Sequence, residues 1–300
     1  MKKFWSGFGW AVICGLVTLA AFGLQTLAAL IAMVPFMIPM YAEMMQMQVS
    51  DPAAIAEKSA EMTAKLTEQS MPYALIAGHL LIVLVFALWY RFGLKRNIIK
   101  GAKSVLTGKT VLVAALLSFA MGCATNFILP LWIQILPQKS VEYYEYLMES
   151  AAIGVSLISN ITAVLVAPIG EELVFRGVSL TFAEKATAKM NNKKVAFWIA
   201  NVLQAFMFGA FHGNLVQGSY AFVMGLGFGY LAKRYNSVLP CILGHMVING
   251  SSILIWNNIS GFIPENNLVY ALGGAVFTAV CVFALKMGGK CVENTEEMAA

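Results

Sequence analysis

The sequence predicts an all-α fold, a polytopic membrane bundle of about eight transmembrane helices. Of its 300 residues, 59% are hydrophobic and only 12% are charged, and the mean hydropathy is +0.74. A soluble domain usually carries about 25% charged residues. Several stretches also exceed the roughly 20 apolar residues that span a bilayer. The net charge of +5 comes from residues in the loops between these stretches, so no nucleic-acid partner is expected.

The spans follow one another along the whole chain. The first begins like a signal peptide, because Lys2 and Lys3 precede an apolar run. That run continues almost to Tyr41, well beyond the roughly 7–15 residues of a signal-peptide core, so we expect a retained helix. Residues 1–300 are therefore expected to form a single integral membrane domain, with spans near residues 8–42, 72–92, 110–136, 151–182, 195–212, 217–232, 237–257 and 267–286.

Basic residues occur in alternate loops, which predicts the orientation of the chain. They precede the first span and follow the second, fourth, sixth and eighth, at Lys2, Lys3, Lys95, Arg96, Lys100, Lys103, Lys109, Lys185, Lys189, Lys193, Lys194, Lys233, Arg234, Lys286 and Lys290. The other loops are acidic or uncharged. Because an excess of Lys and Arg marks the cytoplasmic side, both termini are expected in the cytoplasm. The short loops favour a bacterial plasma membrane.

One loop on the opposite side, residues 43–71, has the composition of a helix. Ile55, Met62 and Leu66 form an apolar stripe along it at helical spacing. We expect this loop to be extracytoplasmic and partly helical, and to extend the first two helices beyond the bilayer.

Ionisable residues within the spans are few. Because charge inside a membrane is costly, such residues are candidates for function. Glu171, Glu172 and Arg176 lie on the fourth span, His212 ends the fifth, and His245 lies on the seventh. A further histidine, His79, lies near the outer end of the second span. It has no polar companion in the sequence, so an interfacial role without chemistry is expected.

Helical spacing assigns different roles to the two glutamates. Glu172 and Arg176 are four residues apart, so they share a helix face and can form an ion pair. Glu171 is rotated about 100° from Glu172 and cannot pair with Arg176 in the same way. We therefore expect Glu172 and Arg176 to brace the site, and Glu171 to handle a proton or a water molecule.

The same four-residue spacing recurs at the histidines. Phe208 precedes His212 by four residues, so its ring can pack under the imidazole, and His245 and Asn249 can point at a common atom. A carboxylate, a histidine and a second histidine with an asparagine suit hydrolysis, since one set activates water and the other stabilises an oxyanion. Taken singly, each set is also compatible with a structural role, as an ion pair, an interfacial histidine or a hydrogen bond between helices.

These three motifs resemble the signatures of the CAAX-processing and bacteriocin-processing intramembrane protease family, which includes the type II CAAX prenyl endopeptidases. The motifs are Glu171-Glu172-x-x-x-Arg176, Phe208-x-x-x-His212 and His245-x-x-x-Asn249. The resemblance covers about residues 150–260, which we therefore expect to be the catalytic core.

The resemblance implies a helical bundle with a central cavity inside the membrane. By analogy with the family, Glu171 and His212 would activate the attacking water, and His245 and Asn249 would hold the oxyanion. Glu172, Arg176 and Phe208 would support them. No metal cofactor is favoured, because the chain has no His-Glu-x-x-His motif. The alternative is a zinc site formed by His212, His245 and Glu171.

Three functions are compatible with these residues. The first is an intramembrane endopeptidase that cuts a lipidated, CAAX-type or otherwise membrane-anchored peptide or protein; its partners would be that substrate, prenylated or not, and the lipid bilayer. The second is a bacteriocin-immunity or scaffold protein of the same family without essential proteolysis. The third is a proton-coupled transporter, which should show repeated halves with matching broken helices. We see no such repeat in the sequence.

The depth of the site poses a constraint. His212 lies about 18 residues into its span, roughly 27 Å of helix, whereas His245 lies only about 8 residues into its own. A common site requires the fifth helix to sit shallow, so that residues 193–198 project on the cytoplasmic side. It also requires the hairpin after His212 to be buried, which is tolerated where such backbone lines a cavity.

Overall fold

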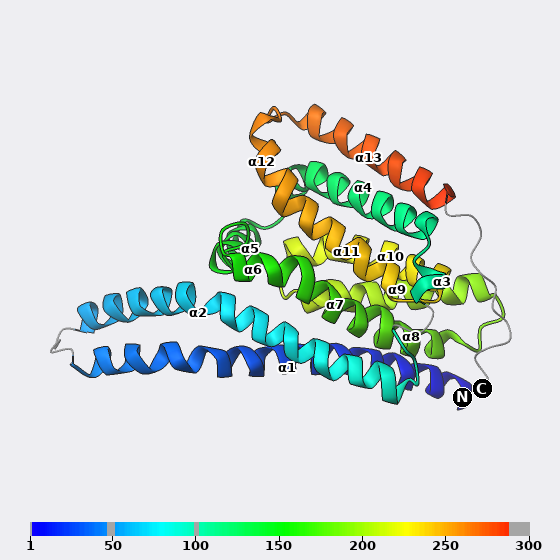
Figure 1. Cartoon of the computed structure of the whole chain (residues 1–300). Coiled ribbons are helices and arrows are strands. Elements are labelled where there is room, and N and C mark those ends of the chain that lie inside the picture. The colour runs from blue at the N-terminus through cyan, green and yellow to red at the C-terminus, as the bar shows by residue number, and fades with distance from the viewer. Residues whose placement is uncertain (1, 47–51, 99–101, 288–300) are drawn as a thin grey trace.

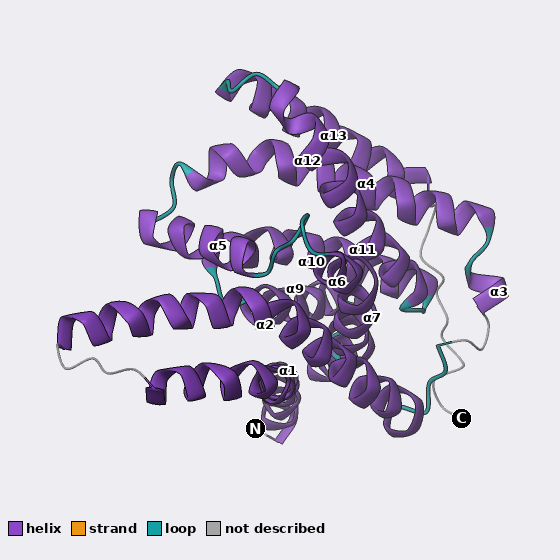
Figure 2. Cartoon of the chain, turned by 60° about the vertical axis from the view of Figure 1, so that its left-hand side comes forward, coloured by secondary structure: helices purple, strands orange, loops and turns teal. Residues whose placement is uncertain are grey.

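The computed structural model describes residues 2–46, 52–98 and 102–287 (Figure 1). Within these ranges the chain is helical and contains no strand (Figure 2). Eight helical segments are long and apolar enough to cross a membrane, which confirms the predicted bundle: Gly7–Met45, Pro52–Gly93, Gly108–Ile133, Leu157–Thr187, Lys193–Phe211, Leu215–Tyr235, Leu239–Phe262 and Asn267–Met287.

Several spans contain more than one helical element. The elements in chain order are α1 (Lys2–Gln46), α2 (Pro52–Leu88), η1 (Trp89–Gly93), α3 (Ala102–Val105), α4 (Gly108–Ile133), α5 (Gln138–Ser150), α6 (Leu157–Ile161), η2 (Thr162–Val166), α7 (Ala167–Glu172), η3 (Leu173–Ser179), α8 (Leu180–Thr187), α9 (Lys193–Phe211), α10 (Leu215–Tyr235), α11 (Leu239–Ser251), η4 (Ser252–Trp256), α12 (Asn257–Ile259), η5 (Ser260–Phe262) and α13 (Asn267–Met287). The span pattern did not predict α5, which is short, polar and buried only at Val141.

Helices α1 and α2 form a long antiparallel hairpin along one side of the molecule (Figure 1). The 45 residues of α1 extend about 67 Å at 1.5 Å per residue, more than twice the hydrocarbon thickness of a bilayer. Most of the segment 43–71 lies in these two helices, and its residues 47–51 fall outside the described ranges. The hairpin therefore extends well beyond the length that a membrane requires.

Close helix packing joins α9 to α10. A Cβ added at Gly225 would lie 2.9 Å from the Cβ of Ala205, and one at Gly229 would overlap the side chain of Asn201. Two buried amides also cross this contact: Asn201 donates to the carbonyl of Leu226 at 3.0 Å, and Gln204 to that of Gly225 at 2.9 Å. Small residues allow the backbones to approach, and the amides then find partners on the facing helix.

The distribution of side chains matches a membrane environment. Large apolar residues such as Leu19, Leu254 and Val276 are exposed on the outside of the bundle, whereas Glu172, Arg176 and the amides of α9 are fully buried. Water would favour the reverse arrangement, but lipid solvates apolar side chains and excludes charged ones. The polar interior is therefore the part of the bundle that carries chemistry.

The fourth span runs through the centre of the bundle and is not one continuous α-helix. Helix α7, which carries both glutamates, is flanked by two π-helical turns, η2 and η3. It packs against α2 on one side and α11 on the other. Such π turns interrupt the regular hydrogen bonds of a helix and often occur at functional sites.

Candidate active site

Pro168 accounts for the widened turn that precedes the glutamates. Its ring has no N–H and clashes with the carbonyl four residues before it. The N–H of Ala167 bonds to the carbonyl of Thr162, five residues back, and not to that of Ala163. Pro168, five residues after Ala163, has no N–H, so the carbonyl of Ala163 has no helical donor. Asn249 of α11 donates to that carbonyl at 2.8 Å. The break in the fourth span thus fixes the position of a side chain on the seventh.

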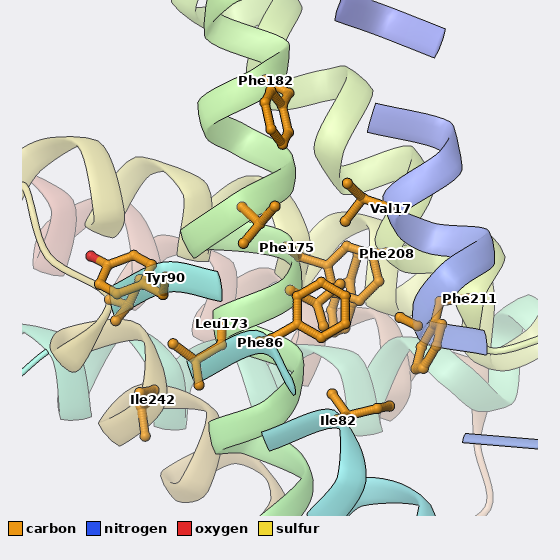
Figure 3. Packing of buried hydrophobic residues seen from close by; sticks show 14 of the residues in the cluster. Val17, Ile82, Phe86, Tyr90, Leu173, Phe175, Phe182, Phe208, Phe211 and Ile242 are labelled. Carbon is orange, nitrogen blue, oxygen red and sulfur yellow. The ribbon is translucent and has the colours of Figure 1, made fainter. Parts of the chain in front are cut away.

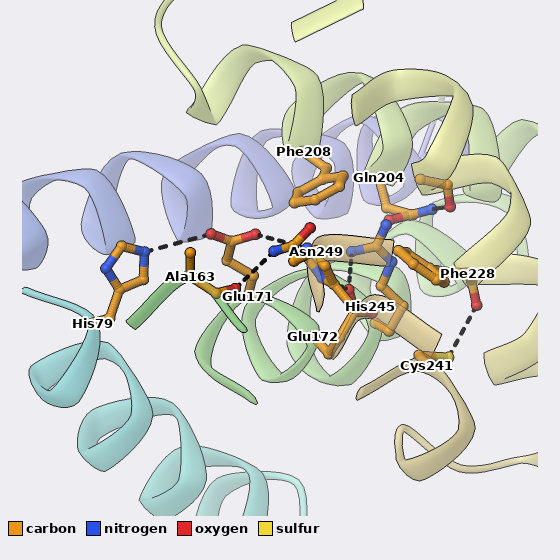
Figure 4. A network of polar contacts seen from close by, with 12 residues as sticks. His79, Ala163, Glu171, Glu172, Gln204, Phe208, Phe228, Cys241, His245 and Asn249 are labelled. Atoms are coloured by element: carbon orange, nitrogen blue, oxygen red, sulfur yellow. Dashed lines mark hydrogen bonds and ion pairs between the residues drawn. The ribbon is translucent and has the colours of Figure 1, made fainter. Parts of the chain in front are cut away.

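Glu172 is the fully buried centre of the polar network (Figure 4). Its Oε1 accepts hydrogen bonds from Nη1 of Arg176 at 2.8 Å and from Nδ1 of His245 at 2.8 Å. The predicted pair of Glu172 and Arg176 is therefore present, and it also holds the histidine of the seventh span. Because Nδ1 of His245 donates to Glu172, its Nε2 is the nitrogen left to act.

Two aromatic rings complete the environment of Arg176. The guanidinium carbon lies 4.2 Å from the ring centre of Phe208 and 5.1 Å from that of Phe228. Within the described residues, Nε and Nη2 have no hydrogen-bond partner and face this aromatic surface instead. The same rings pack on the histidines: Phe208 lies edge-on to His212 at 5.0 Å, and Phe228 stacks on His245 at 5.2 Å. Cation–π attraction therefore supplements the single strong ion pair.

Glu171 lies between two histidines (Figure 4). Its Oε1 is 3.4 Å from Nε2 of His79, and its Oε2 is 3.8 Å from Nε2 of His245. The prediction that His79 lacks a polar partner is wrong. The sequence shows which residues are neighbours along the chain, whereas the partner of His79 is on another span. The signal was available, since His79 is an ionisable residue inside an apolar span.

A glycine brings α2 close enough for this contact. A Cβ at Gly170 would lie 3.0 Å from Cγ2 of Ile82, 3.3 Å from Cγ2 of Val83 and 3.6 Å from the carbonyl oxygen of His79. A larger residue at Gly170 would push α2 away from α7. The glycine before the two glutamates thus allows the close helix approach that places His79 beside Glu171.

His212 is the C-cap residue of α9 and precedes a tight turn. Gly213 has a φ of +67°, which favours glycine, and the side chain of Asn214 caps α10 by accepting from the N–H of Gln217 at 2.7 Å. The amide of Asn214 also donates to the carbonyl of His212 at 3.1 Å. The structure brings His212 into the same cavity as Glu171 and His245, so the depth difference seen in the sequence does not separate them.

All three histidines are oriented in the same way. The Nδ1 atom of each contacts an acceptor, which is the carbonyl of Leu75 at 2.8 Å for His79, the carbonyl of Phe208 at 2.9 Å for His212, and Glu172 for His245. Each Nδ1 therefore carries its proton, and each Nε2 remains available for a substrate, a water or Glu171.

The cavity has a volume of about 900 Å³. His79, Glu171, His212, His245 and Asn249 all line it, together with apolar and aromatic residues from α1, α4 and α5. This volume is at the upper end of the range of about 300–1,000 Å³ for small-molecule sites, so it can admit a short peptide segment.

The charged and imidazole groups do not converge as metal ligands do. Among the described residues, no three His, Cys, Asp or Glu side chains are grouped so as to hold a metal ion. The two oxygens of Glu171 face different histidines, His79 and His245, rather than one common point. Zinc requires its ligands about 2.0–2.3 Å from a single centre.

Comparison with known families gives a match over the segment that contains the three motifs. Residues 154–251 match the family model described as type II CAAX prenyl endopeptidase Rce1-like. The match spans all three motifs and agrees with the resemblance drawn from them. Comparisons with curated proteins and with solved structures gave no match.

The ion pair at the centre of this site predicts a large effect on stability. Arg176→Ala leaves the buried carboxylate of Glu172 without its cation, so we expect the free energy of unfolding to fall by about 3–5 kcal/mol. Thermal or denaturant unfolding in detergent micelles measures this loss. Arg176→Ala combined with Glu172→Gln should recover part of it, because the charge left behind is removed.

Lys233→Ala is the matched control. Lys233 pairs with Glu184 at the same 2.8 Å, but both side chains are partly exposed. Such a pair contributes about 1 kcal/mol or less. Equal losses in the two variants would mean that burial does not determine the contribution of the Arg176 pair.

Proposed function

We propose that this protein is an intramembrane endopeptidase, because residues 154–251 match the family model described as type II CAAX prenyl endopeptidase Rce1-like. The family supports peptide-bond hydrolysis in general. The observation that carries the proposal is the environment of Glu171, a buried carboxylate on the cavity wall with histidines at both oxygens. Such a carboxylate can take a proton from a water molecule and return it later.

The proposed reaction begins with a water between Glu171 and His245. The 3.8 Å between Oε2 and Nε2 is too wide for a direct hydrogen bond, so a water in the cavity beside them can contact both atoms. Glu171 takes a proton from this water as its oxygen attacks the carbonyl carbon of the peptide. The C–N bond then breaks, and the proton passes from Glu171 to the leaving amine. His212, whose Nε2 faces the same cavity, orients the water.

The oxyanion formed in this step requires hydrogen-bond donors. One N–H of the Asn249 amide is bonded to Ala163, which leaves the second N–H for the oxyanion. His245 donates from Nε2 when both of its ring nitrogens carry protons, and Glu172 supports that state by accepting from Nδ1. Donors held in place before the reaction stabilise developing charge without further reorganisation.

The proposed substrate is a lipidated, CAAX-type or otherwise membrane-anchored peptide. The largely apolar lining of the cavity suits a peptide that arrives from the bilayer. The alternating basic loops support an orientation with both termini in the cytoplasm. The short loops between most spans support a bacterial plasma membrane.

We also propose that the reaction proceeds without a metal ion. The support is the arrangement of the possible metal ligands: one carboxylate oxygen of Glu171 faces His79 and the other faces His245. If zinc does bind, His212, His245 and Glu171 are the residues that would hold it, and it would supply an activated water.

Replacement of the proposed base tests the function directly. We expect Glu171→Gln to lower the cleavage of a farnesylated CAAX peptide by about 10²–10⁴-fold, the usual contribution of a general base. His212→Ala and His245→Ala should also abolish measurable cleavage. Detergent-purified protein provides the assay, and unchanged melting temperatures show that the variants are folded.

Glu149→Gln, at an exposed carboxylate of α5, is the matched control and should keep full activity. Normal turnover by a folded Glu171→Gln protein would exclude Glu171 as the base. A folded native protein that cuts no peptide would instead favour the immunity or scaffold role.

A chelator distinguishes activation of the water by side chains alone from activation by a bound zinc ion. Since the proposed reaction uses only side chains, we expect EDTA to leave cleavage unchanged and added zinc to have no effect. Loss of activity on chelation that zinc restores would assign a metal to His212, His245 and Glu171.

His79 provides a prediction that the motifs alone do not make. Its Nε2 and Oε1 of Glu171 would repel if both were acceptors, so a proton lies between them and the imidazole orients the carboxylate. His79→Leu should lower kcat about 10–100-fold with little change in KM, as expected for losing a hydrogen bond to a charged group.

His79→Gln keeps an N–H donor close to the position of Nε2 and should recover most of that loss. If both variants are equally slow, the role of His79 is packing rather than orientation. If the Leu variant keeps the native kcat, His79 has no part in the reaction.

A further inference from the structure

The cavity lies in one half of the bundle. On spans that run away from the basic loops, its lining residues come late: Gly122 to Leu129 on α4, and His245 to Asn257 on the seventh span. On spans that run towards the basic loops, they come early: Ser159 to Glu171 on the fourth span, and Gln217 to Met224 on α10. The cavity is therefore displaced from the side that carries Lys and Arg.

The other half of the bundle is densely packed. Between the glutamates and the basic loops, the side chains of Leu173, Phe175 and Val178 of η3 are fully buried. Phe228 of α10 and Cys241 of α11 are fully buried as well. Figure 3 shows part of this layer. The rings of Phe175 and Phe208 are tilted against each other there, with their centres 5.0 Å apart. Beyond it, near Lys233, is a cavity of only about 40 Å³, which has room for very few waters. Among the described residues, this packed layer therefore separates Glu171 from the basic loops.

The opposite end of the cavity reaches the uncharged and acidic loops. Tyr143, Tyr144, Leu147 and Met148 of α5 line it there, together with Ile153. Burial raises the pKa of Tyr144, so its phenol stays neutral at pH 7. This end is the extracytoplasmic one if the basic loops are cytoplasmic.

The charge of the lining restricts what can bind. Among the described residues, the cavity wall contains no Lys, Arg or Asp, and its only ionisable groups besides tyrosine are Glu171 and the three histidines. The carboxylate of a carboxy-terminal tripeptide would lie about 10 Å from the bond being cut, at 3.3–3.6 Å per residue. Among the described residues of the wall there is no Lys or Arg to pair with it, and an unpaired charge in an apolar site is costly.

From these observations we propose that the cavity accepts an uncharged stretch within a membrane-anchored or exported peptide, from the extracytoplasmic side. The proposal rests on the proposed function and orientation, and it specifies the substrate of that same site. Cleavage takes place inside a chain that continues on both sides of the bond, because the described part of the wall offers no Lys or Arg to pair with a free terminal carboxylate.

Labelling of single positions tests the side of access without requiring proteolysis. Asn257 is an exposed residue that lines the cavity, whereas Asn191 is exposed in the loop between α8 and α9, among the basic residues. With Asn257→Cys, a membrane-impermeant maleimide should react on intact cells. With Asn191→Cys, it should react only on inverted membrane vesicles. The native protein, with its five cysteines, gives the background to subtract. Reaction of Asn257→Cys only in inverted vesicles would overturn the proposed side of access.

A pair of peptides tests the charge requirement. The farnesylated CAAX peptide is compared with the same peptide ending in an amide, and we expect kcat/KM at least about tenfold higher for the amide because its end is uncharged. A preference for the free acid would overturn the proposed substrate class. Cleavage of neither peptide would count against the endopeptidase function, whereas the labelling result would still decide the side of access.

Discussion

A single carboxylate oxygen holds the site together. Oε1 of Glu172 accepts from Arg176 on its own span and from His245 on the seventh span, each at 2.8 Å and both fully shielded from solvent. In low dielectric these contacts are strong, and a buried charge without them would be costly. Through Phe208 and Phe228, the guanidinium also contacts the fifth and sixth spans. Four spans thus depend on one ion pair for their relative positions, and the catalytic candidates lie on three of them.

The fourth span gains its chemistry from departures from a regular helix. Pro168 and the π turn before it leave the carbonyl of Ala163 without a helical partner, and Asn249 fills that place. Gly170 then lets α2 approach until His79 reaches Glu171. Each departure weakens the helix on its own, but each is compensated by a residue of a neighbouring span. In a membrane this compensation must come from protein, because no water is present to satisfy the freed groups.

The bundle also separates packing from chemistry along its length. One half contains the aromatic core around Phe175 and the braced pair of Glu172 and Arg176. The other half contains the cavity, where Nε2 of His79 contacts Glu171 and the Nε2 atoms of His212 and His245 remain available. The rigid half fixes side-chain orientations to within hydrogen-bonding tolerance, and the open half leaves space for a substrate. This division suits a hydrolytic site that must keep a polar reaction apart from surrounding lipid.

The sequence alone was sufficient to predict the eight spans, because the length of an apolar stretch and the charge of a loop can be read from consecutive residues. It also identified the pair of Glu172 and Arg176, because four residues of helix place two side chains on one face. It could not identify the partner of His79 or the role of Ala163, because both contacts join different spans and depend on how closely helices approach. Nor could it predict α5 as a wall of the cavity, since that helix has no apolar span to reveal it. Side-chain spacing is a property of one helix, whereas the position of Glu171 between two histidines depends on the packing of three.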